Sequence, residues 1–181
     1  MRRTTRPRPI RLLWRTALCV VLLAGLLTGF QRAGFLYKRD NSLPGKIYRF
    51  EKTGEYRRGD LVLLCIPEGA DRFAEDRRYF LFRGRPCPEE AWKIGKEILA
   101  VPGDQVEISR RGIAVNGQLL AGTRPIAQDA EGRPLAPALS PATKLEAGWL
   151  IVGTRYPASY DSRYFGPVPE TYLAGKIRRV F

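Results

Sequence analysis

An apolar run without charge, Thr16–Phe30, constrains the fold of this chain more than any other feature. It has fifteen residues, whereas a membrane-spanning helix needs about 20. We expect Arg15 to snorkel outward at one end of this helix and Phe35–Tyr37 to extend it at the other. Residues 1–15 carry six arginines and no acidic residue, so we expect an irregular basic tail there.

The basic tail predicts which way the apolar segment crosses the membrane. Positively charged flanks stay on the cytoplasmic side. We therefore expect a cytoplasmic tail over residues 1–15, a single-pass anchor in the lipid of the inner membrane over 16–37, and a periplasmic domain over 38–181. A cleaved signal peptide is one alternative, although no clean cleavage motif follows the run. A buried core helix is another, which the one-sided charge disfavours.

Composition excludes several kinds of chemistry. The sequence has no histidine and three cysteines, which excludes Ser-His-Asp catalysis, a His-ligated metal and a four-cysteine zinc site. We expect no metal and no cofactor, so proton chemistry must use Lys, Asp, Glu or Tyr. The net charge of +13 would suit nucleic acid. Beyond residue 30, however, positive side chains are interspersed with acids, and we expect no nucleic-acid partner.

The rest of the chain has the pattern of a mainly β domain. Short apolar runs alternate with Gly, Pro, Asn and Asp, which favour turns. Asn116-Gly117 predicts a hairpin with a type I′ turn. A helix is expected over Ala70–Phe80, and the Pro- and Ala-rich segment Thr123–Thr143 is expected to be an exposed excursion. The predicted strands are Leu61–Ile66, Glu97–Val101, Gln105–Ser109, Gly112–Val115, Gln118–Leu120 and Gly148–Gly153.

The predicted topology also bears on the cysteines. Cys65 and Cys87 would lie in an oxidising compartment, where a disulfide between them would contribute roughly 3 kcal/mol by closing a loop. Two separate buried thiols are the alternative. Cys19 lies in the apolar run and is expected to pack there.

The stretch Ser159–Val168 is too polar for a core and too aromatic for a solvated linker. Asp161 and Arg163 lie two residues apart, so in an extended segment they share a face with Ser159 and can brace each other. The alternative is a turn with a surface ion pair, which would contribute little stability.

Ser42 and Lys96 supply a candidate nucleophile and a candidate base. A serine is a poor nucleophile unless a base takes its proton, and without histidine the available base is a lysine stripped of water. Lowering a lysine pKa from about 10.4 to about 7.5 costs roughly 4 kcal/mol, which requires burial or a nearby positive charge. Each residue also has a purely structural interpretation. Ser42 could be an ordinary turn residue, and Lys96 could be a lysine at a strand end whose amine extends into solvent.

Four segments occur in a fixed order along the chain: SLP at Ser42, RGDLVLL at Arg58, KEILAVPGD at Lys96 and SYDSRYFGPVPE at Ser159. In order and spacing they resemble the type I signal peptidases, most closely their conjugative-transfer branch, the TraF-like peptidases. The Cys87-Pro88 pair and the VNG hairpin resemble that branch as well. The resemblance covers nearly the whole chain and implies a signal-peptidase-like β domain behind an N-terminal transmembrane helix.

The resemblance implies a role for each matched residue. Ser42 would be the acylating nucleophile and Lys96 its general base, while Ser159 would orient the lysine amine. Asp161 and Arg163 would hold the Ser159 segment against the lysine strand. The backbone N–H of Ser42 would help to stabilise the oxyanion.

Three positions depart from the family pattern. Secretory enzymes often carry a hydroxyl, a second oxyanion donor, two residues before the nucleophile, where this chain has Asp40. Residues 153–157 replace the G-D-N-R entry to the last segment. The serine loop reads LPGKIY, with Gly45 one position earlier than in TraF-like chains.

Together these features predict a membrane-anchored serine endopeptidase that cleaves a precursor at the outer face of the cytoplasmic membrane, with a rate that rises with pH. By resemblance, the substrate is a pilin-like or other conjugative-transfer protein, and conjugation machinery is a possible partner. A general secretory signal peptidase and a non-catalytic bitopic component of a conjugation or secretion channel are the alternatives.

Overall fold

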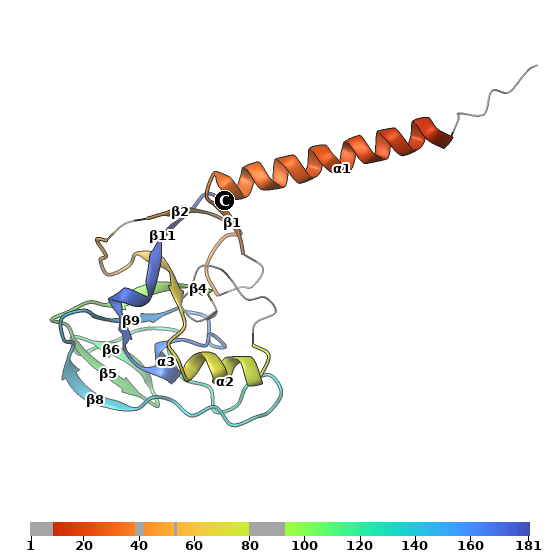
Figure 1. Ribbon diagram of the computed structural model, residues 1–181. Coiled ribbons are helices and arrows are strands. Elements are labelled where there is room, and N and C mark those ends of the chain that lie inside the picture. The colour runs from red at the N-terminus through yellow and green to blue at the C-terminus, as the bar shows by residue number, and fades with distance from the viewer. Residues whose placement is uncertain (1–8, 39–41, 53, 80–92) are drawn as a thin grey trace, which may run out of the picture. The chain divides into compact units, whose positions relative to one another are not determined.

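A computed structural model describes residues 9–38, 42–52, 54–79 and 93–181 (Figure 1). It divides the chain into two compact units, residues 1–36 and residues 37–181. The first unit is mostly helix, and the second contains most of the strands and the candidate site residues. The mainly β fold predicted from the sequence is confirmed.

Helix α1 (Pro9–Arg32) makes up most of the first unit. Within it, Leu12–Phe30 is a stretch of 19 residues with mean hydropathy 1.9, and it is not buried against other described residues. At about 1.5 Å per residue this stretch is about 28 Å long, close to the ~30 Å hydrocarbon core of a bilayer. Length and composition therefore make α1 a candidate membrane span.

Both ends of α1 differ from the sequence-based expectation. The helix begins at Pro9, inside the segment expected to be irregular, because proline fits the first helical turn, where its missing N–H is not needed. It ends at Arg32 and is followed by Gly34, whose φ of 79° leaves the helical region. Phe35–Tyr37 is consequently a short strand, β1, and the expectation that it extends the helix was wrong.

An antiparallel sheet in the second unit contains the strand that carries Lys96. Its core consists of aliphatic side chains from the central strands, among them Val62, Ile98 and Val152. From β2 onward, the order of neighbouring strands is β2 (Ile47–Glu51), β11 (Leu173–Arg179), β3 (Leu61–Cys65), β4 (Lys93–Ala100), β9 (Trp149–Gly153) and β10 (Val168–Pro169).

A second antiparallel sheet encloses its own apolar cluster, which includes Val106, Ile108 and Ile113. Strands β4 and β9 contribute to both clusters, since alternate side chains of each strand point to opposite faces. The strands of this second sheet, in order of pairing, are β7 (Gln118–Leu119), β6 (Gly112–Val115), β5 (Gln105–Ser109) and β8 (Ser140–Lys144).

The predicted hairpin joins β6 to β7. Asn116 has φ 52° and Gly117 has φ 79°, the two positive values that a type I′ turn requires. Ala114 pairs with Leu119 and Val115 with Gln118 across the turn. This part of the prediction is confirmed.

The segment Thr123–Thr143 is less exposed than expected. It contributes most of the edge strand β8, and it buries Thr123 completely and Leu135 to 6% exposure. Leu135 packs with Ala74 of helix α2 (Ala70–Asp76) and with Tyr160. The excursion is therefore anchored to the domain at these two residues.

Asp104 ties the turn after β4 to two other segments. Its carboxylate accepts hydrogen bonds from the Val101 N–H (2.9 Å) and from the Asn116 amide (3.0 Å), and it forms an ion pair with Arg58. Desolvation acts to raise the pKa of Asp104, but these hydrogen bonds and the Arg58 charge outweigh it, and the pKa lies below its usual value. The RGD and PGD segments thus meet at one carboxylate.

Replacing Asp104 with asparagine should lower the free energy of unfolding by roughly 1.5–3 kcal/mol at neutral pH, since hydrogen bonds to a charged group are lost. The folded-state pKa lies below that of the unfolded chain, so the stabilisation is present above about pH 4 and disappears as the pH falls further. Urea unfolding of both proteins at pH 7 and pH 3 measures this. A difference that does not shrink at pH 3 would contradict it, and Glu146→Gln, an exposed carboxylate, is the control.

Cys65 is 3% exposed at the end of β3. Cys87 lies outside the described residues, so the Cys65–Cys87 disulfide stays a prediction. Cys19 is an exposed free thiol on α1, and no described protein segment packs on it. The residues around it are apolar and would suit membrane lipid.

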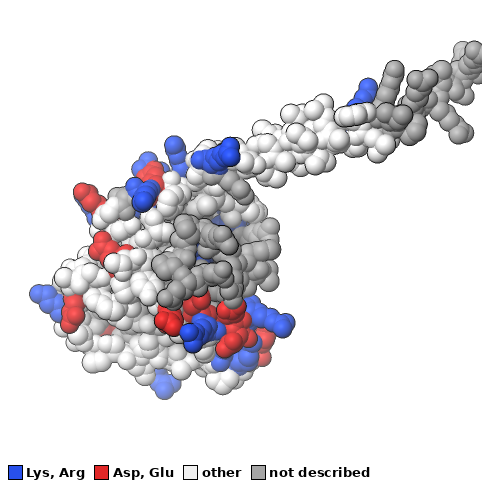
Figure 2. Space-filling view, in the orientation of Figure 1, with Lys and Arg blue, Asp and Glu red and all other residues white. Residues whose placement is uncertain are grey.

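Charges of both signs are interspersed on the surface of the second unit. On the face shown in Figure 2, positive side chains lie beside negative ones and do not form a continuous stripe among the described residues.

Candidate active site

Lys96 is a buried residue of strand β4. It pairs with Val62 across β3 and β4 and lies on the same strand face as the buried residues Ile94 and Ile98. Only 4% of Lys96 is exposed. Such an apolar environment disfavours the charged ammonium form relative to the neutral amine.

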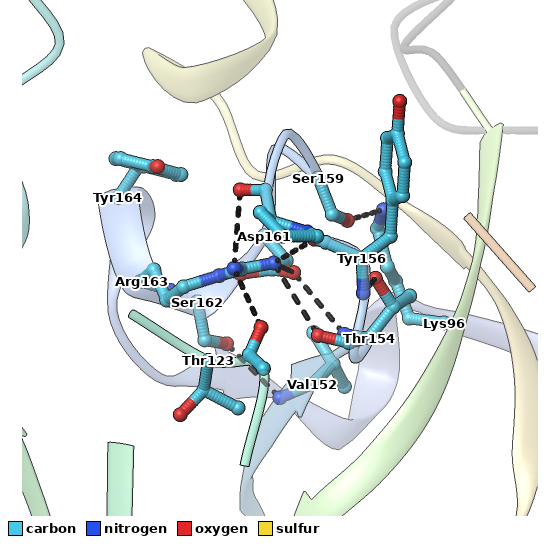
Figure 3. A network of polar contacts seen from close by, with 12 residues as sticks. Lys96, Thr123, Val152, Thr154, Tyr156, Ser159, Asp161, Ser162, Arg163 and Tyr164 are labelled. Atoms are coloured by element: carbon cyan, nitrogen blue, oxygen red, sulfur yellow. Dashed lines mark hydrogen bonds and ion pairs between the residues drawn. The ribbon is translucent and has the colours of Figure 1, made fainter. Parts of the chain in front are cut away.

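The Lys96 amine is hydrogen-bonded to Ser159. Its Nζ lies 2.6 Å from Ser159 Oγ, and both side chains are buried (Figure 3). Ser159 belongs to the loop between β9 and the short helix α3 (Ser162–Phe165), and its N–H donates to the Tyr156 carbonyl at 3.1 Å. The structure therefore brings together two residues that lie 63 positions apart in the sequence.

Asp161 and Arg163 form a completely buried ion pair. Arg163 Nε donates to Asp161 Oδ1 at 2.8 Å, and Nη2 donates to Oδ2 at 2.7 Å. The two residues do not lie together in an extended segment, which the sequence predicted, because Arg163 is part of helix α3. Asp161 caps the N-terminus of α3, where its carboxylate also accepts the Arg163 N–H at 3.2 Å. The alternative of a surface ion pair is likewise wrong.

Arg163 uses its remaining donors on backbone carbonyls. It reaches the carbonyls of Tyr156 (3.0 Å) and Thr154 (3.4 Å), and at 3.3 Å those of Pro157 and Gly122. One guanidinium thus fixes the path of the loop that leads to Ser159, as Figure 3 shows.

The same pair connects this loop to β9. Asp161 Oδ2 accepts the Thr154 N–H at 3.2 Å, directly after the strand ends. Ser162 Oγ accepts the Val152 N–H at 3.0 Å. Because β9 pairs with β4, with Gly153 opposite Glu97, the loop is held beside the lysine strand.

An aromatic cluster holds the other side of the Ser159 loop. The ring of Tyr160 stacks between Phe73, with centroids 5.7 Å apart, and Tyr164, 5.9 Å away. Burial raises the pKa of the Tyr160 phenol, which keeps it neutral. Ser159 is therefore followed by a residue that the core immobilises.

The serine segment packs against the lysine strand. Leu43 is 5% exposed, and a Cβ placed on Gly95 would lie 3.1 Å from Leu43 Cδ1. The residue after Ser42 thus contacts the residue before Lys96. Ser42 itself is partly buried, and Asp40 lies outside the described residues.

Sequence reasoning missed two residues of this region. Thr154 is 1% exposed, and its Oγ1 accepts the Tyr156 N–H at 3.2 Å, which shapes the loop. Its position directly after a predicted strand, followed by Pro157, was the available signal. Lys93 is another lysine on β4; it is partly buried, and burial lowers its pKa. It lies an odd number of residues from Lys96, on the opposite strand face.

The sequence of this chain matches a known family over most of its length. The model of the family described as "Signal peptidase, peptidase S26" matches residues 11–181. The chain therefore belongs to the signal peptidase family S26, a family of serine peptidases. The family and the apolar helix α1 both indicate a membrane-anchored protein.

Among the relatives are proteins of plasmid transfer. The conjugal transfer protein TraF of Agrobacterium fabrum (strain C58 / ATCC 33970) is 37% identical over 141 residues, which cover 77% of this chain and 78% of that protein. A plasmid transfer protein TraF of Escherichia coli is 33% identical, with 82% and 83% covered. The predicted resemblance to the conjugative-transfer branch is confirmed.

The matches also include two proteins named as signal peptidase I. A probable signal peptidase I-2 of Synechocystis sp. (strain ATCC 27184 / PCC 6803 / Kazusa) is 32% identical over 45% of this chain and 34% of its own. The crystal structure of a signal peptidase I from Enterococcus faecalis V583 is 18% identical, with a TM-score of 0.39, and covers 68% of this chain and 97% of its own.

Proposed function

We propose that this chain is a membrane-anchored endopeptidase that uses Ser42 as nucleophile and Lys96 as general base. The buried hydrogen bond between Lys96 Nζ and Ser159 Oγ is the observation that supports this most. An amine with 4% exposure in an apolar sheet favours its neutral form, which has a lone pair to accept a proton. The packing of Leu43 on Gly95 brings the serine segment to the same strand.

The proposed reaction proceeds through an acyl-enzyme. Lys96 Nζ takes the proton of the Ser42 hydroxyl as Oγ attacks the carbonyl carbon of the scissile peptide. The Ser42 N–H donates to the oxyanion that forms. The protonated Lys96 then gives its proton to the departing amine of the first product. The neutral Lys96 amine next takes a proton from a water molecule as the water attacks the acyl-enzyme carbonyl carbon. Lys96 returns that proton to Ser42 Oγ as the ester bond breaks, which regenerates the serine and releases the second product.

The supporting residues act through position. Ser159 orients the Lys96 amine, and the Asp161–Arg163 pair fixes the loop that carries Ser159. Because these contacts are buried, the lysine meets the serine without first reorganising its surroundings. The distribution of roles is the one that the family resemblance implies.

We further propose the topology and the substrate class. The arginine-rich segment before α1 would stay in the cytoplasm, and the β unit would work in the periplasm. The anchor would keep the site near the bilayer surface, where the cleavage site of a precursor emerges. Similarity to TraF proteins supports a pilin-like or other conjugative-transfer precursor. The proposed Cys65–Cys87 disulfide would form in that compartment.

The test is cleavage of candidate pilin precursors by the full chain in detergent, with the products weighed by mass spectrometry. We expect one endoproteolytic cut, a rate that rises with pH as the amine loses its proton, and no product from Ser42→Ala. A product formed by Ser42→Ala at an undiminished rate would refute Ser42 as the nucleophile, and absence of any product from the parent chain would favour the non-catalytic channel component. Complementation of cells depleted of signal peptidase I separates the general secretory alternative.

A further inference from the structure

The serine loop, residues 42–47, approaches the end of β11 very closely at Gly45. Gly45 has φ +84°, and a Cβ built on it would lie 2.5 Å from the Phe181 carbonyl oxygen and 2.7 Å from Arg179 Cδ. Optimal contacts between heavy atoms are about 3.5–4.0 Å. Only glycine fits here, both for its left-handed backbone and for the space.

Hydrogen bonds hold the loop at the same place. The Phe181 carbonyl accepts the N–H groups of Lys46 (2.9 Å) and Ile47 (3.3 Å), and the Val180 N–H donates to the Ile47 carbonyl at 2.8 Å. The Tyr48 hydroxyl donates to the Pro44 carbonyl. Pro44, on one side of Gly45, and Lys46 and Ile47, on the other, are thus held by backbone or hydroxyl contacts.

Leu43 and β11 pack over the same residue of the lysine strand. A Cβ on Gly95 would lie 3.1 Å from Leu43 Cδ1 and 3.4 Å from Ile177 Cδ1. Ile177 belongs to β11 and pairs with Phe50 of β2. The loop and β11 therefore both lie against Gly95, and they approach each other directly at Gly45.

We propose that the segment Arg179–Phe181, which consists of the last residue of β11 and the two residues after it, is a positioning element that sets the location of the Ser42 hydroxyl through Gly45. The inference rests on the proposed function, because it needs Ser42 to be the nucleophile. It also explains why the glycine of LPGKIY stands at position 45, where the sequence departs from TraF-like chains. At position 45 the Phe181 carbonyl leaves no room for a side chain, so the residue there has to be glycine.

The test compares Gly45→Ala with Gly148→Ala in the full chain. Gly148 has φ +78° and no atom within 4 Å of a built Cβ, so it carries the same backbone strain without the close approach. For Gly45→Ala we expect kcat for precursor cleavage to fall roughly 10- to 100-fold, since a displacement of about 1 Å has that effect. KM should change less than about threefold in both variants, and Gly148→Ala should keep kcat.

A second variant, deletion of Val180 and Phe181, guards against misfolding of Gly45→Ala. It removes the Phe181 carbonyl without adding volume, and we expect a similar loss of kcat with the thermal melting midpoint nearly unchanged. Full kcat in either folded variant would overturn the positioning role. Failure of the proposed function is separate, since it would appear as cleavage by Ser42→Ala.

Discussion

Replacing Lys96 with methionine should reduce precursor cleavage on the order of 10³- to 10⁴-fold, because the proposed general base is lost. Methionine has a similar length and suits the apolar face that Lys96 shares with Ile94 and Ile98. Burying an amine costs free energy that methionine does not require. The thermal melting midpoint should therefore stay the same or rise, which separates loss of catalysis from loss of fold.

Lys93→Met is the matched control. Lys93 lies on the same strand and burial lowers its pKa, but its side chain belongs to the other face of β4. We expect its cleavage rate to stay within about twofold of the parent rate. The assignment of the base to Lys96 would be wrong if Lys93→Met lost activity while Lys96→Met kept it. Single-turnover rates on one precursor measure both variants.

Asp161→Ala should have the largest effect on stability. It leaves the Arg163 guanidinium buried without its carboxylate, and removing one partner of a buried ion pair typically costs about 3–5 kcal/mol. The variant also removes the cap of α3 and the acceptor of the Thr154 N–H. Denaturant unfolding at neutral pH measures the loss.

An exposed ion pair provides the comparison for Asp161. Arg72 and Glu68 lie 3.0 Å apart, but 76% and 65% of their side chains are exposed. Glu68→Ala should change the free energy of unfolding by less than about 1 kcal/mol. Equal effects of Glu68→Ala and Asp161→Ala would contradict the view that burial makes the Asp161–Arg163 pair structurally important.

Periodicity and turn chemistry predicted much of the fold. Leu61–Ile66 and Gly148–Gly153 have continuous apolar runs, and Asn116-Gly117 has the residues that a type I′ turn needs, so local preference and final structure agree. The start of β4 was missed because Lys93, Gly95 and Lys96 interrupt its apolar pattern. Strand β8 (Ser140–Lys144) was missed because an exposed edge strand containing Pro141 has no apolar alternation to reveal it.

The candidate site was predicted residue by residue, but not its environment. Spacing placed Asp161 and Arg163 close together, yet nothing local indicates that both are fully buried. Their burial depends on the carbonyl groups that accept from Arg163, and backbone acceptors have no sequence signature; these carbonyls belong to Gly122, Thr154, Tyr156 and Pro157. The resemblance to signal peptidases supplied the partnership of Lys96 with Ser159, which hydrophobic pattern alone could not give.

Strands β4 and β9 serve two apolar clusters at once, with Ile98 and Val152 in one and Leu99 and Ile151 in the other. Loss of packing in either cluster therefore disturbs β4 and β9, on which the packing of the other cluster also depends. Such sharing favours concerted melting over piecemeal fraying. Strand β4, which carries Lys96, is held rigid by packing in both clusters. A destabilising substitution in the smaller sheet would therefore also change the position of the Lys96 amine.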